Sequence, residues 1–379
     1  MKIGVLGGGQ LGQMMALAGY PLGFHLRFLD RAADAPAGQV AECIAARFED
    51  QDALRRFGAG VDVVTYEFEN VPASAARYLS EHVPRFIPPP MALEIAQDRL
   101  VQKQFFQRLG IPTAVFAPII TGAEIEPALA LTGLPAVLKT RRWGYDGKGQ
   151  SVVCEAADVR RAWESMGGAP LILESFVQFD RELSLVAVRG VTGETAFYPL
   201  TENHHREGIL RVSRAPALGL APGQQQTAES YATKIFAELG YGGVLTIEFF
   251  SRGGMLLANE MATRVHNSGH WTIEGAETSQ FENHLRAIAG LPLGLASPRG
   301  HSAMVNFIGT LPDTNALLAV PGIHLHIYGK SPRRGRKLGH ATVCAASPEA
   351  LSTLLHHLQG LASCIDNLRA ERVREPVAR

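Results

Sequence analysis

A glycine-rich turn near the N-terminus restricts the possible folds of this chain more than any other feature. Lys2 to Leu6 form a short apolar run, followed directly by Gly7-Gly8-Gly9-Gln10-Leu11-Gly12 and then by a helix-like stretch, Gln13 to Tyr20. Glycines between a strand and a helix let the backbone approach a ligand, and the free amides at the helix start can bind a phosphate. Further strands at His25 to Leu29 and Val61 to Tyr66 would give an alternating βαβ pattern. We therefore expect a doubly wound parallel sheet at the start of the chain.

The same turn also matches the dinucleotide-binding fingerprint. Gly7, Gly9 and Gly12 have its spacing, and Asp30 lies near the position of a ribose-binding acid. A nicotinamide-dependent oxidoreductase is therefore one interpretation. Another phosphorylated ligand is a second interpretation, and a turn that serves only close packing is a third.

Length and composition indicate a globular protein of several domains. A chain of 379 residues fits two or three domains, and 46% hydrophobic with 19% charged residues excludes general disorder. Basic and acidic residues balance at 36 each, so no overall field favours nucleic acid or an anionic membrane. The cysteines show no CxxC spacing, and the opening apolar run is too short for a signal peptide or a spanning helix. We expect a cytoplasmic protein that binds neither nucleic acid nor membrane.

The middle of the chain predicts a helix followed by a small mixed unit. Ala92 to Leu109 is expected to form one helix, which stops at Gly110 and links two domains. Short strands are then expected at Ala136 to Thr140, Ser151 to Cys154 and Leu171 to Phe176, separated by glycine turns. This pattern is typical of an α+β lid.

The remainder predicts longer strands and a compact end. Leu183 to Tyr198 and Gly243 to Met261 are expected to form longer strands with turns. The chain from Ala303 onward is expected to form a β-containing unit that is closed by a helix over Pro348 to Leu358.

A second glycine-rich segment follows Lys139, which ends an apolar strand. The run from Gly144 to Gln150 reads GYDGKGQ, and its glycines and lysine could form a flexible cover over a triphosphate. A lysine held by a strand can neutralise phosphate oxygens while the loop closes and excludes water. The segment is not a Walker loop, and a solvated hairpin is the alternative interpretation.

Glu248 and Glu260 lie on two expected strands that Ser251 to Gly254 join as a hairpin. Both carboxylates share a face only if the loop has an odd number of residues, such as three with one glycine in a left-handed conformation. Carboxylates in apolar runs are costly to bury without a cation, and magnesium prefers hard oxygen ligands shared with phosphates. An exposed polar face of an edge hairpin is the alternative.

Two further segments suggest ligand binding. Arg264 to Trp271 is a polar and aromatic run without helix or strand period, as expected for a binding loop beside a metal. Lys330 to Lys337 is a basic cluster in a chain of zero net charge, which a phosphate ligand would explain. A solvated turn would also explain it.

Taken in chain order, these segments resemble one known family. The resemblance rests on GGGQLGQM at the start, QDRLVQKQ at 97 to 104, Lys139 with GYDGKGQ, Glu174 with Glu182, YPLTENHHREGILR, IEFF, NEMATRVHNSGHWT and GRKLGHATV. The chain resembles the N5-carboxyaminoimidazole ribonucleotide synthetases, the ATPase-subunit type of phosphoribosylaminoimidazole carboxylase, within the ATP-grasp superfamily. The residues after about Leu358 carry no recognisable motif of that family.

The resemblance implies an α/β and α+β protein with the ATP-grasp fold. Its parts would be an N-terminal doubly wound pre-ATP-grasp domain over 1–97, a lid over 98–182, a core with the metal site over 183–300 and a small C-terminal domain over 301–379 that completes the ribonucleotide site. A homodimer is also expected.

The resemblance further implies a reaction of de novo purine biosynthesis. ATP would phosphorylate bicarbonate to carboxyphosphate, and the exocyclic amine of 5-aminoimidazole ribonucleotide would capture the carboxyl group, releasing ADP and phosphate. Magnesium, or manganese, would bind at Glu248 and Glu260. Tyr145, Asp146, Lys148 and Arg264 would act in catalysis.

The implied binding sites are larger sets of residues. The ATP site would comprise Arg99, Lys139, Gly144, Tyr145, Asp146, Gly147, Lys148, Gly149, Gln150, Glu174, Ser175, Phe176, Val177, Glu182, His205, Asn259 and Glu260. The ribonucleotide site would comprise Gln10, Leu11, Glu67, Arg264, His266, Asn267, Lys330, Arg336 and Lys337. The chain departs from the wider superfamily at Ala262, where an asparagine is frequent, and Asn259 is the residue that could compensate.

Three alternative functions remain open from the sequence. A related ATP-grasp ligase, such as a formate-dependent glycinamide ribonucleotide transformylase, would share the phosphate, metal and ribonucleotide sites. A nicotinamide-dependent oxidoreductase would leave Glu248, Glu260 and the second glycine loop without a role. A catalytically silent nucleotide-binding protein would not need every one of these polar residues.

Overall fold

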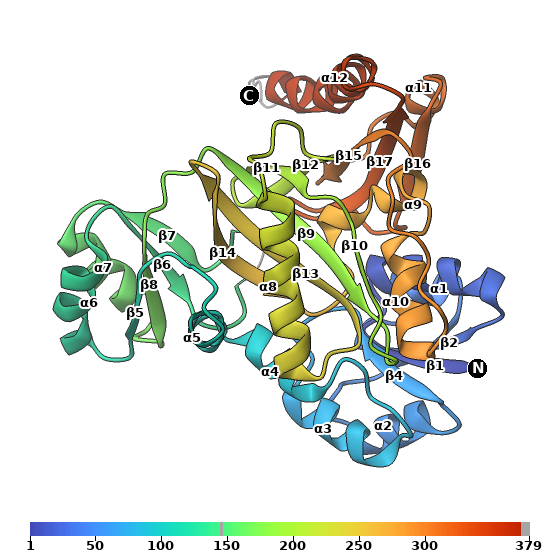
Figure 1. Cartoon of the computed structure of the whole chain (residues 1–379), viewed down its shortest axis with the longest axis horizontal. Helices are drawn as coiled ribbons and strands as arrows, with labels where there is room; N and C mark the ends of the chain where they lie inside the picture. The colour runs from blue at the N-terminus through green and yellow to red at the C-terminus, as the bar shows by residue number, and fades with distance from the viewer. Residues whose placement is uncertain (145–146, 373–379) are drawn as a thin grey trace, which may run out of the picture.

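Three sheets form the framework of the computed structural model, which describes residues 1–144 and 147–372 (Figure 1). A four-stranded parallel sheet lies at the N-terminus and a second four-stranded sheet belongs to the lid. A nine-stranded sheet forms the centre of the molecule. Short 3-10 helices lie at Tyr20–Leu22, Pro36–Gln39, Gly122–Glu124 and Asn267–Gly269.

The N-terminal sheet is the doubly wound unit that the sequence predicts. Its order is β3-β2-β1-β4, and its strands and helices are β1 (Lys2–Leu6), α1 (Gln10–Gly19), β2 (His25–Asp30), β3 (Glu42–Ala45), α2 (Gln51–Gly58), β4 (Val63–Tyr66) and α3 (Ala73–His82). Helix α1 begins at Gln10, earlier than expected, so the glycine turn leads straight into it. Strand β3 is not indicated by the sequence patterns.

The single helix expected over Ala92 to Leu109 is wrong, because two helices occupy this stretch. Helices α4 (Pro90–Gln97) and α5 (Arg99–Arg108) meet at Asp98, whose backbone is extended. The Asp98 carboxylate accepts hydrogen bonds from the backbone N–H groups of Leu100 and Val101, at 3.1 and 3.4 Å. Asp98 is therefore the N-cap of α5. The break turns α5 so that Arg99, its first residue, points into the site described below.

The lid is a mixed α+β unit, as the sequence predicts. Its antiparallel sheet has the order β5-β8-β6-β7, and its strands and helices are β5 (Phe116–Ile119), α6 (Ile125–Thr132), β6 (Ala136–Thr140), β7 (Gln150–Val153), α7 (Ala156–Ser165) and β8 (Leu171–Ser175). Both helices pack on one face of this sheet through a common apolar cluster.

The central sheet runs through the rest of the chain in the order β14-β13-β9-β11-β12-β15-β17-β16, with β10 paired to β9. Helix α8 lies across one face (Figure 1). The elements up to α10 are β9 (Arg181–Arg189), β10 (Thr195–Phe197), β11 (Thr201–Arg206), β12 (Ile209–Ala215), α8 (Gln224–Leu239), β13 (Gly243–Arg252), β14 (Met255–Ala262), α9 (Thr272–Gly275) and α10 (Gln280–Ala289). The longer strands expected here are confirmed.

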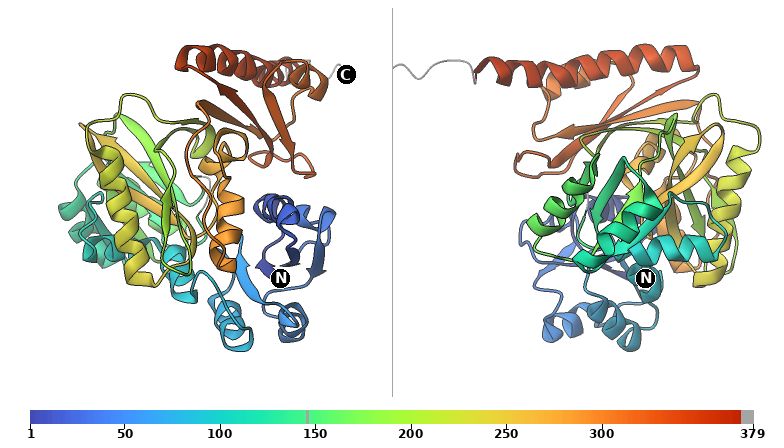
Figure 2. Two further views of the ribbon diagram at one scale, coloured as in Figure 1. Left: turned by 45° about the vertical axis from the view of Figure 1, so that its right-hand side comes forward. Right: turned by 90° about the vertical axis from the view of Figure 1, so that its left-hand side faces the viewer.

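The C-terminal unit continues the central sheet, because β15 pairs with β12. Its elements are β15 (His301–Ile308), α11 (Thr314–Leu318), β16 (Ile323–Ile327), β17 (Lys337–Ala345) and α12 (Pro348–Arg372). Helix α12 is longer than expected and covers β15 and β17 through Leu351, Leu355 and Leu358. The loop between β16 and β17 extends toward the N-terminal sheet (Figure 2).

Asp98 also joins α5 to the start of the glycine loop. Its carboxylate oxygens accept from Nε and Nη2 of Arg141 at 3.0 and 2.7 Å, although Asp98 is almost fully buried. Burial alone would raise the pKa of Asp98, but the Arg141 guanidinium holds it below its usual value.

We predict that Asp98→Ala destabilises the protein more than Asp98→Asn. Asparagine keeps the N-cap acceptor and loses only the charge that faces Arg141, whereas alanine loses both. The loss of the cap lowers the free energy of unfolding by about a further 1 kcal/mol. Asp50 caps α2 through the amides of Asp52 and Ala53 and provides the matched control substitutions. The measurement is the unfolding midpoint in urea. Equal midpoints for both Asp98 variants would contradict the role of the cap.

Candidate active site

Glu248 and Glu260 stand directly opposite each other on β13 and β14. Side chains of directly paired residues project from the same face of a sheet, so both carboxylates lie on one side. The prediction that a three-residue loop produces this arrangement is wrong. The connection has only two residues, Gly253 and Gly254, both with positive φ.

A β-bulge produces the common face instead. Phe249 pairs with Ala258, yet its neighbour Glu248 pairs with Glu260. Asn259 is therefore the extra residue on β14, and it shifts the register by one position. Without the bulge, Glu248 would stand opposite Asn259 and Glu260 would face the other side of the sheet.

The two carboxylates differ in charge state because their neighbours differ. Burial, and then the proximity of Glu260, raise the pKa of Glu248 to about 7. Burial would also raise the pKa of Glu260, but Arg99 and Lys139 hold it below the usual value. Nη1 of Arg99 lies 2.7 Å from Oε2 of Glu260. Glu260 is thus the ionised member, and Glu248 accepts a proton near neutral pH.

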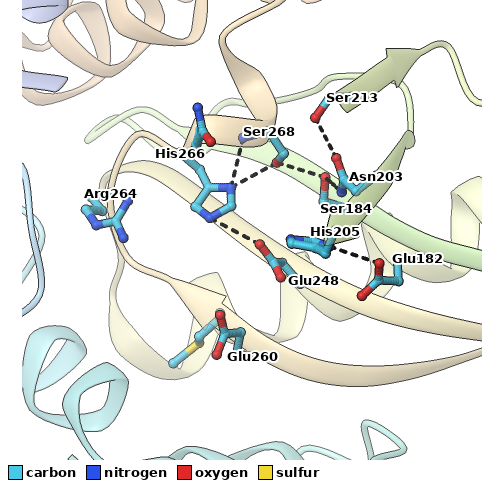
Figure 3. A network of polar contacts seen from close by, with 12 residues as sticks. Glu182, Ser184, Asn203, His205, Ser213, Glu248, Glu260, Arg264, His266 and Ser268 are labelled. Carbon is cyan, nitrogen blue, oxygen red and sulfur yellow. Dashed lines mark hydrogen bonds and ion pairs between the residues drawn. The ribbon is translucent and has the colours of Figure 1, made fainter. Parts of the chain in front are cut away.

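Two histidines lie beside the carboxylate pair (Figure 3). Nε2 of His266 is 3.2 Å from Oε1 of Glu248, and Nδ1 of His205 is 2.9 Å from Oε2 of Glu182. Burial, together with Arg264, lowers the pKa of His266 well below its usual value, so this ring is neutral. Burial would also lower the pKa of His205, but the bond to Glu182 raises it.

A buried cluster of charges links the lid to the central sheet. Oε2 of Glu174 lies 3.0 Å from Nζ of Lys139 and 3.3 Å from Nζ of Lys103. Burial would raise the pKa of Glu174, but the two lysines lower it to about 2. Burial lowers the pKa of Lys103 to about 8. Lys139 is buried but lies at the wall of a cavity rather than in an apolar core.

The first glycine turn is held by carboxylates. Glu67 accepts from the backbone N–H groups of Gly9 and Gly12 at 2.7 and 3.1 Å, and Asp30 accepts from that of Gly8 at 2.7 Å. Asp30 therefore helps to hold the turn. Nζ of Lys330, from the β16–β17 loop, donates to the side-chain oxygen of Gln10.

These groups surround one cavity of about 880 Å³ where the three sheets meet. Tyr145 and Asp146 lie outside the described residues. Of the other predicted site residues, only Gly149 is not part of the described wall; its carbonyl accepts from Thr140 N at 2.7 Å. The wall contains Gln10, Leu11, Glu67, Arg99, Lys139, Gly144, Gly147, Lys148, Gln150, Glu174, Ser175, Phe176, Val177, Glu182, His205, Glu248, Asn259, Glu260, Arg264, His266, Asn267, Lys330, Arg336 and Lys337. A second, more open hollow of about 920 Å³, lined by residues between Thr192 and Pro298, contains none of them.

Glu69, in the wall of the cavity, and Lys103, behind it, are charged residues that the sequence patterns do not assign to the site. Glu69 lies 2.9 Å from Nη2 of Arg264, and Lys103 bridges Glu174 and the carbonyl of Ala258. Two signals were present in the sequence. Glu69 follows Glu67 at the alternating spacing of a strand end, and Lys103 falls on the buried face of its helix.

Family models match most of the chain. Residues 1–97 match the ribonucleotide synthetase preATP-grasp domain, residues 104–281 the ATP-grasp domain, and residues 302–353 the phosphoribosylaminoimidazole carboxylase C-terminal domain. The N5-carboxyaminoimidazole ribonucleotide synthase of Pseudomonas aeruginosa is 53% identical to this chain, over 95% of the chain and 99% of its own length. The chain belongs to the N5-carboxyaminoimidazole ribonucleotide synthase family.

Solved structures of the family agree with this membership. The N5-carboxyaminoimidazole ribonucleotide synthetase of Thermus thermophilus superposes with a TM-score of 0.92 at 56% identity, covering 95% of this chain and 98% of that one. An Aspergillus clavatus N5-carboxyaminoimidazole synthase in complex with ADP and 5-aminoimidazole ribonucleotide has a TM-score of 0.88 at 32% identity, covering 97% and 98%.

Membership of the N5-carboxyaminoimidazole ribonucleotide synthase family confirms the expected ATP-grasp fold and the expected ligase class. It excludes the nicotinamide-dependent oxidoreductase. Throughout the part of the chain that the structure describes, no helix has the length and apolar character needed to span a membrane.

We predict opposite effects of two glutamine substitutions on the ligand-free protein. A carboxyl group whose pKa is higher in the folded than in the unfolded protein favours its neutral form on folding. Above the folded pKa the group is charged in both states, and its charge then lowers the stability of the fold. Glu248→Gln should therefore raise the apparent Tm at pH 8 and change it little at pH 5. Glu260→Gln removes an ionised partner of Arg99 and should lower the Tm at pH 8. The check is thermal unfolding of both variants at the two pH values, and a lower Tm for Glu248→Gln at pH 8 would contradict the account.

Proposed function

We propose that this chain uses ATP and bicarbonate to carboxylate the exocyclic amine of 5-aminoimidazole ribonucleotide. The products are N5-carboxyaminoimidazole ribonucleotide, ADP and phosphate. The observation that carries the proposal is the single cavity, in which a carboxylate pair, a strand lysine and a basic cluster face the same space. The complex of the Aspergillus clavatus protein with ADP and 5-aminoimidazole ribonucleotide supports it.

The triphosphate end of the cavity lies beside Arg99, Lys139 and the described wall residues of the glycine loop, Gly144, Gly147, Lys148 and Gln150. Arg99 and Lys139 already lower the pKa of Glu260, so phosphate oxygens that enter between them meet a positive field. The adenine end is formed by Ser175, the last residue of β8, with Phe176 and Val177, and Glu182 is available for the ribose hydroxyls.

Magnesium, or manganese, fits the carboxylate pair. Two opposed carboxylates, one with a raised pKa, are the arrangement that a divalent cation stabilises, and both donors are hard oxygens. Among the described residues no group of three or more His, Cys, Asp or Glu could hold a metal, so Glu248 and Glu260 would share the ion with phosphate oxygens. When bound, the ion would neutralise charge that develops on the transferred phosphoryl group.

The ribonucleotide end is formed by Gln10, Leu11, Lys330, Arg336 and Lys337. Burial lowers the pKa of Lys330 to about 8, so an incoming phosphate would favour its charged form. The contact of Lys330 with Gln10 joins the basic cluster to the glycine turn, and this contact supports a 5′-phosphate site beside the two residues.

The glycine loop would protect carboxyphosphate, which is labile in water. Its described part packs against the β11–β12 turn, where an added Cβ on Gly147 would come within 2.7 Å of the Glu207 carbonyl oxygen. Such close packing can exclude water from the reacting groups. Arg264, held by Glu69, is the cation available to stabilise the developing charge, and Tyr145, Asp146 and Lys148 remain proposed catalytic residues. We also propose that the chain acts as a homodimer.

Arg336→Ala should raise the KM for 5-aminoimidazole ribonucleotide by about 10- to 100-fold, because the variant loses one charge-assisted hydrogen bond to the phosphate. The KM for ATP should stay within about twofold of the wild-type value. Arg299→Ala is the matched control, because Arg299 is an exposed arginine that pairs with Glu277 away from the cavity. A rise in the ATP KM with an unchanged ribonucleotide KM would reverse the assignment of the two ends.

The function is tested by steady-state ADP release with different substrates. We expect release with bicarbonate plus 5-aminoimidazole ribonucleotide, and none above background with formate plus glycinamide ribonucleotide. The reverse result would assign the chain to the transformylase reaction. No release with either pair would support a silent nucleotide-binding protein.

A further inference from the structure

A line of buried polar side chains leads from the middle of the central sheet to the carboxylate pair (Figure 3). It begins at Ser213 on β12, passes Asn203 on β11 and Ser184 on β9, and reaches Ser268 and His266 in the segment after β14. Ser213, Ser184 and Ser268 are completely buried, and Asn203 is almost so. We refer to these five residues as the polar line.

The hydrogen bonds of the polar line have one direction. Oγ of Ser213 donates to Oδ1 of Asn203 at 2.7 Å, which orients the amide so that its Nδ2 donates to Oγ of Ser184 at 2.9 Å. Oγ of Ser184 in turn donates to Oγ of Ser268 at 2.9 Å. A hydroxyl has one proton, so a serine that accepts from one neighbour passes its own proton to the next.

The polar line ends at Nδ1 of His266. Oγ of Ser268 lies 2.9 Å from this nitrogen, and the backbone N–H of Ser268 donates to it at 3.2 Å. Two donors that face one ring nitrogen require it to be the acceptor, so the single proton of the neutral ring lies on Nε2. Nε2 is the atom that lies 3.2 Å from Oε1 of Glu248.

We propose that Ser268 and Ser184 are positioning residues for Glu248. They hold His266 in the tautomer that presents an Nε2 proton to Glu248, and this contact keeps the carboxylate opposite Glu260. His266 therefore acts through Glu248, in addition to lining the cavity. The inference deepens the proposed function, since it rests on the carboxylate pair as the cation site.

Partners behind a ligating group fix its orientation, and their loss weakens metal binding by about 10- to 100-fold. A purely structural role of the same serines would instead lower the stability of the fold and leave the folded site intact. Tautomer and cation affinity therefore distinguish the two roles, whereas thermal stability does not.

The tautomer can be measured directly on the full chain. Long-range 1H–15N spectra of protein labelled with 15N-histidine report which ring nitrogen carries the proton, and His266→Asn identifies the signals of His266. We expect Nε2 to be protonated in the wild type. Ser268→Ala removes the shorter of the two contacts to Nδ1 and leaves the backbone N–H at 3.2 Å, so we expect a minor Nδ1-protonated population beside the Nε2-protonated form. A wild-type ring protonated on Nδ1 would overturn the proposal.

Cation affinity provides the second readout, measured by electron paramagnetic resonance of Mn²⁺ titrated into the protein with ADP. Ser268→Ala should weaken Mn²⁺ binding about tenfold, and Ser184→Ala should weaken it less. Ser268→Thr keeps the hydroxyl and should restore most of the affinity. Ser302→Ala is the matched control, because Ser302 is equally buried and its hydroxyl contacts Cys344 rather than the polar line.

The outcomes separate this inference from the proposed function. Unchanged Mn²⁺ affinity in Ser268→Ala, with normal loss of affinity in Glu248→Gln, would overturn the positioning role alone. If the wild type binds Mn²⁺ no more tightly than Glu248→Gln, the proposed cation site is overturned. The positioning role of the serines, which acts through Glu248 at that site, is then overturned as well.

Discussion

The carboxylates of Glu248 and Glu260 repel each other, because they stand at directly opposite positions of β13 and β14. The neighbouring charged groups of the site compensate this repulsion. Arg99 stabilises the charge on Glu260, while burial leaves Glu248 ready to accept a proton. A divalent cation between them would remove the repulsion and bring phosphate oxygens to the same point. The charge imbalance of the ligand-free site would thus be the physical basis for the proposed binding of magnesium together with nucleotide.

The position of this pair explains why the site draws on residues from Gln10 to Lys337. The pair lies near one edge of the central sheet, the lid contributes Lys139, and the N-terminal sheet contributes a glycine turn held by Glu67. Because β15 pairs with β12, the C-terminal strands extend the same sheet and bring the basic cluster to the glycine turn. Two ligands can therefore meet in one space although their binding residues belong to different sheets.

The sequence predicted features that depend on local pattern and missed those that depend on tertiary partners. Strands that end in glycines were recognisable, and so were the acidic hairpin and the basic cluster. The apolar period continues across Asp98, so the pattern does not predict the break there; the cap and the bond to Arg141 reveal it. The bulge at Asn259 leaves no mark in the residue spacing. The spacing therefore favours a three-residue loop, whereas the common face of the glutamates depends on the bulge. Burial of Glu69 and Lys103 is favourable only beside Arg264 and Glu174, which lie far away in the sequence.

We propose that bicarbonate is phosphorylated by ATP and that its carboxyl group is then transferred within the same cavity. This reaction sequence is tested most directly by following the oxygen atoms of bicarbonate labelled with 18O. If a bicarbonate oxygen attacks the γ-phosphate of ATP, that oxygen bridges carbon and phosphorus in carboxyphosphate. When the amine of 5-aminoimidazole ribonucleotide then attacks the carbon, the C–O bond breaks and each released phosphate keeps one labelled oxygen. Mass spectrometry of that phosphate should show this single label. Phosphate without label, formed at the same rate as N5-carboxyaminoimidazole ribonucleotide, would contradict the account.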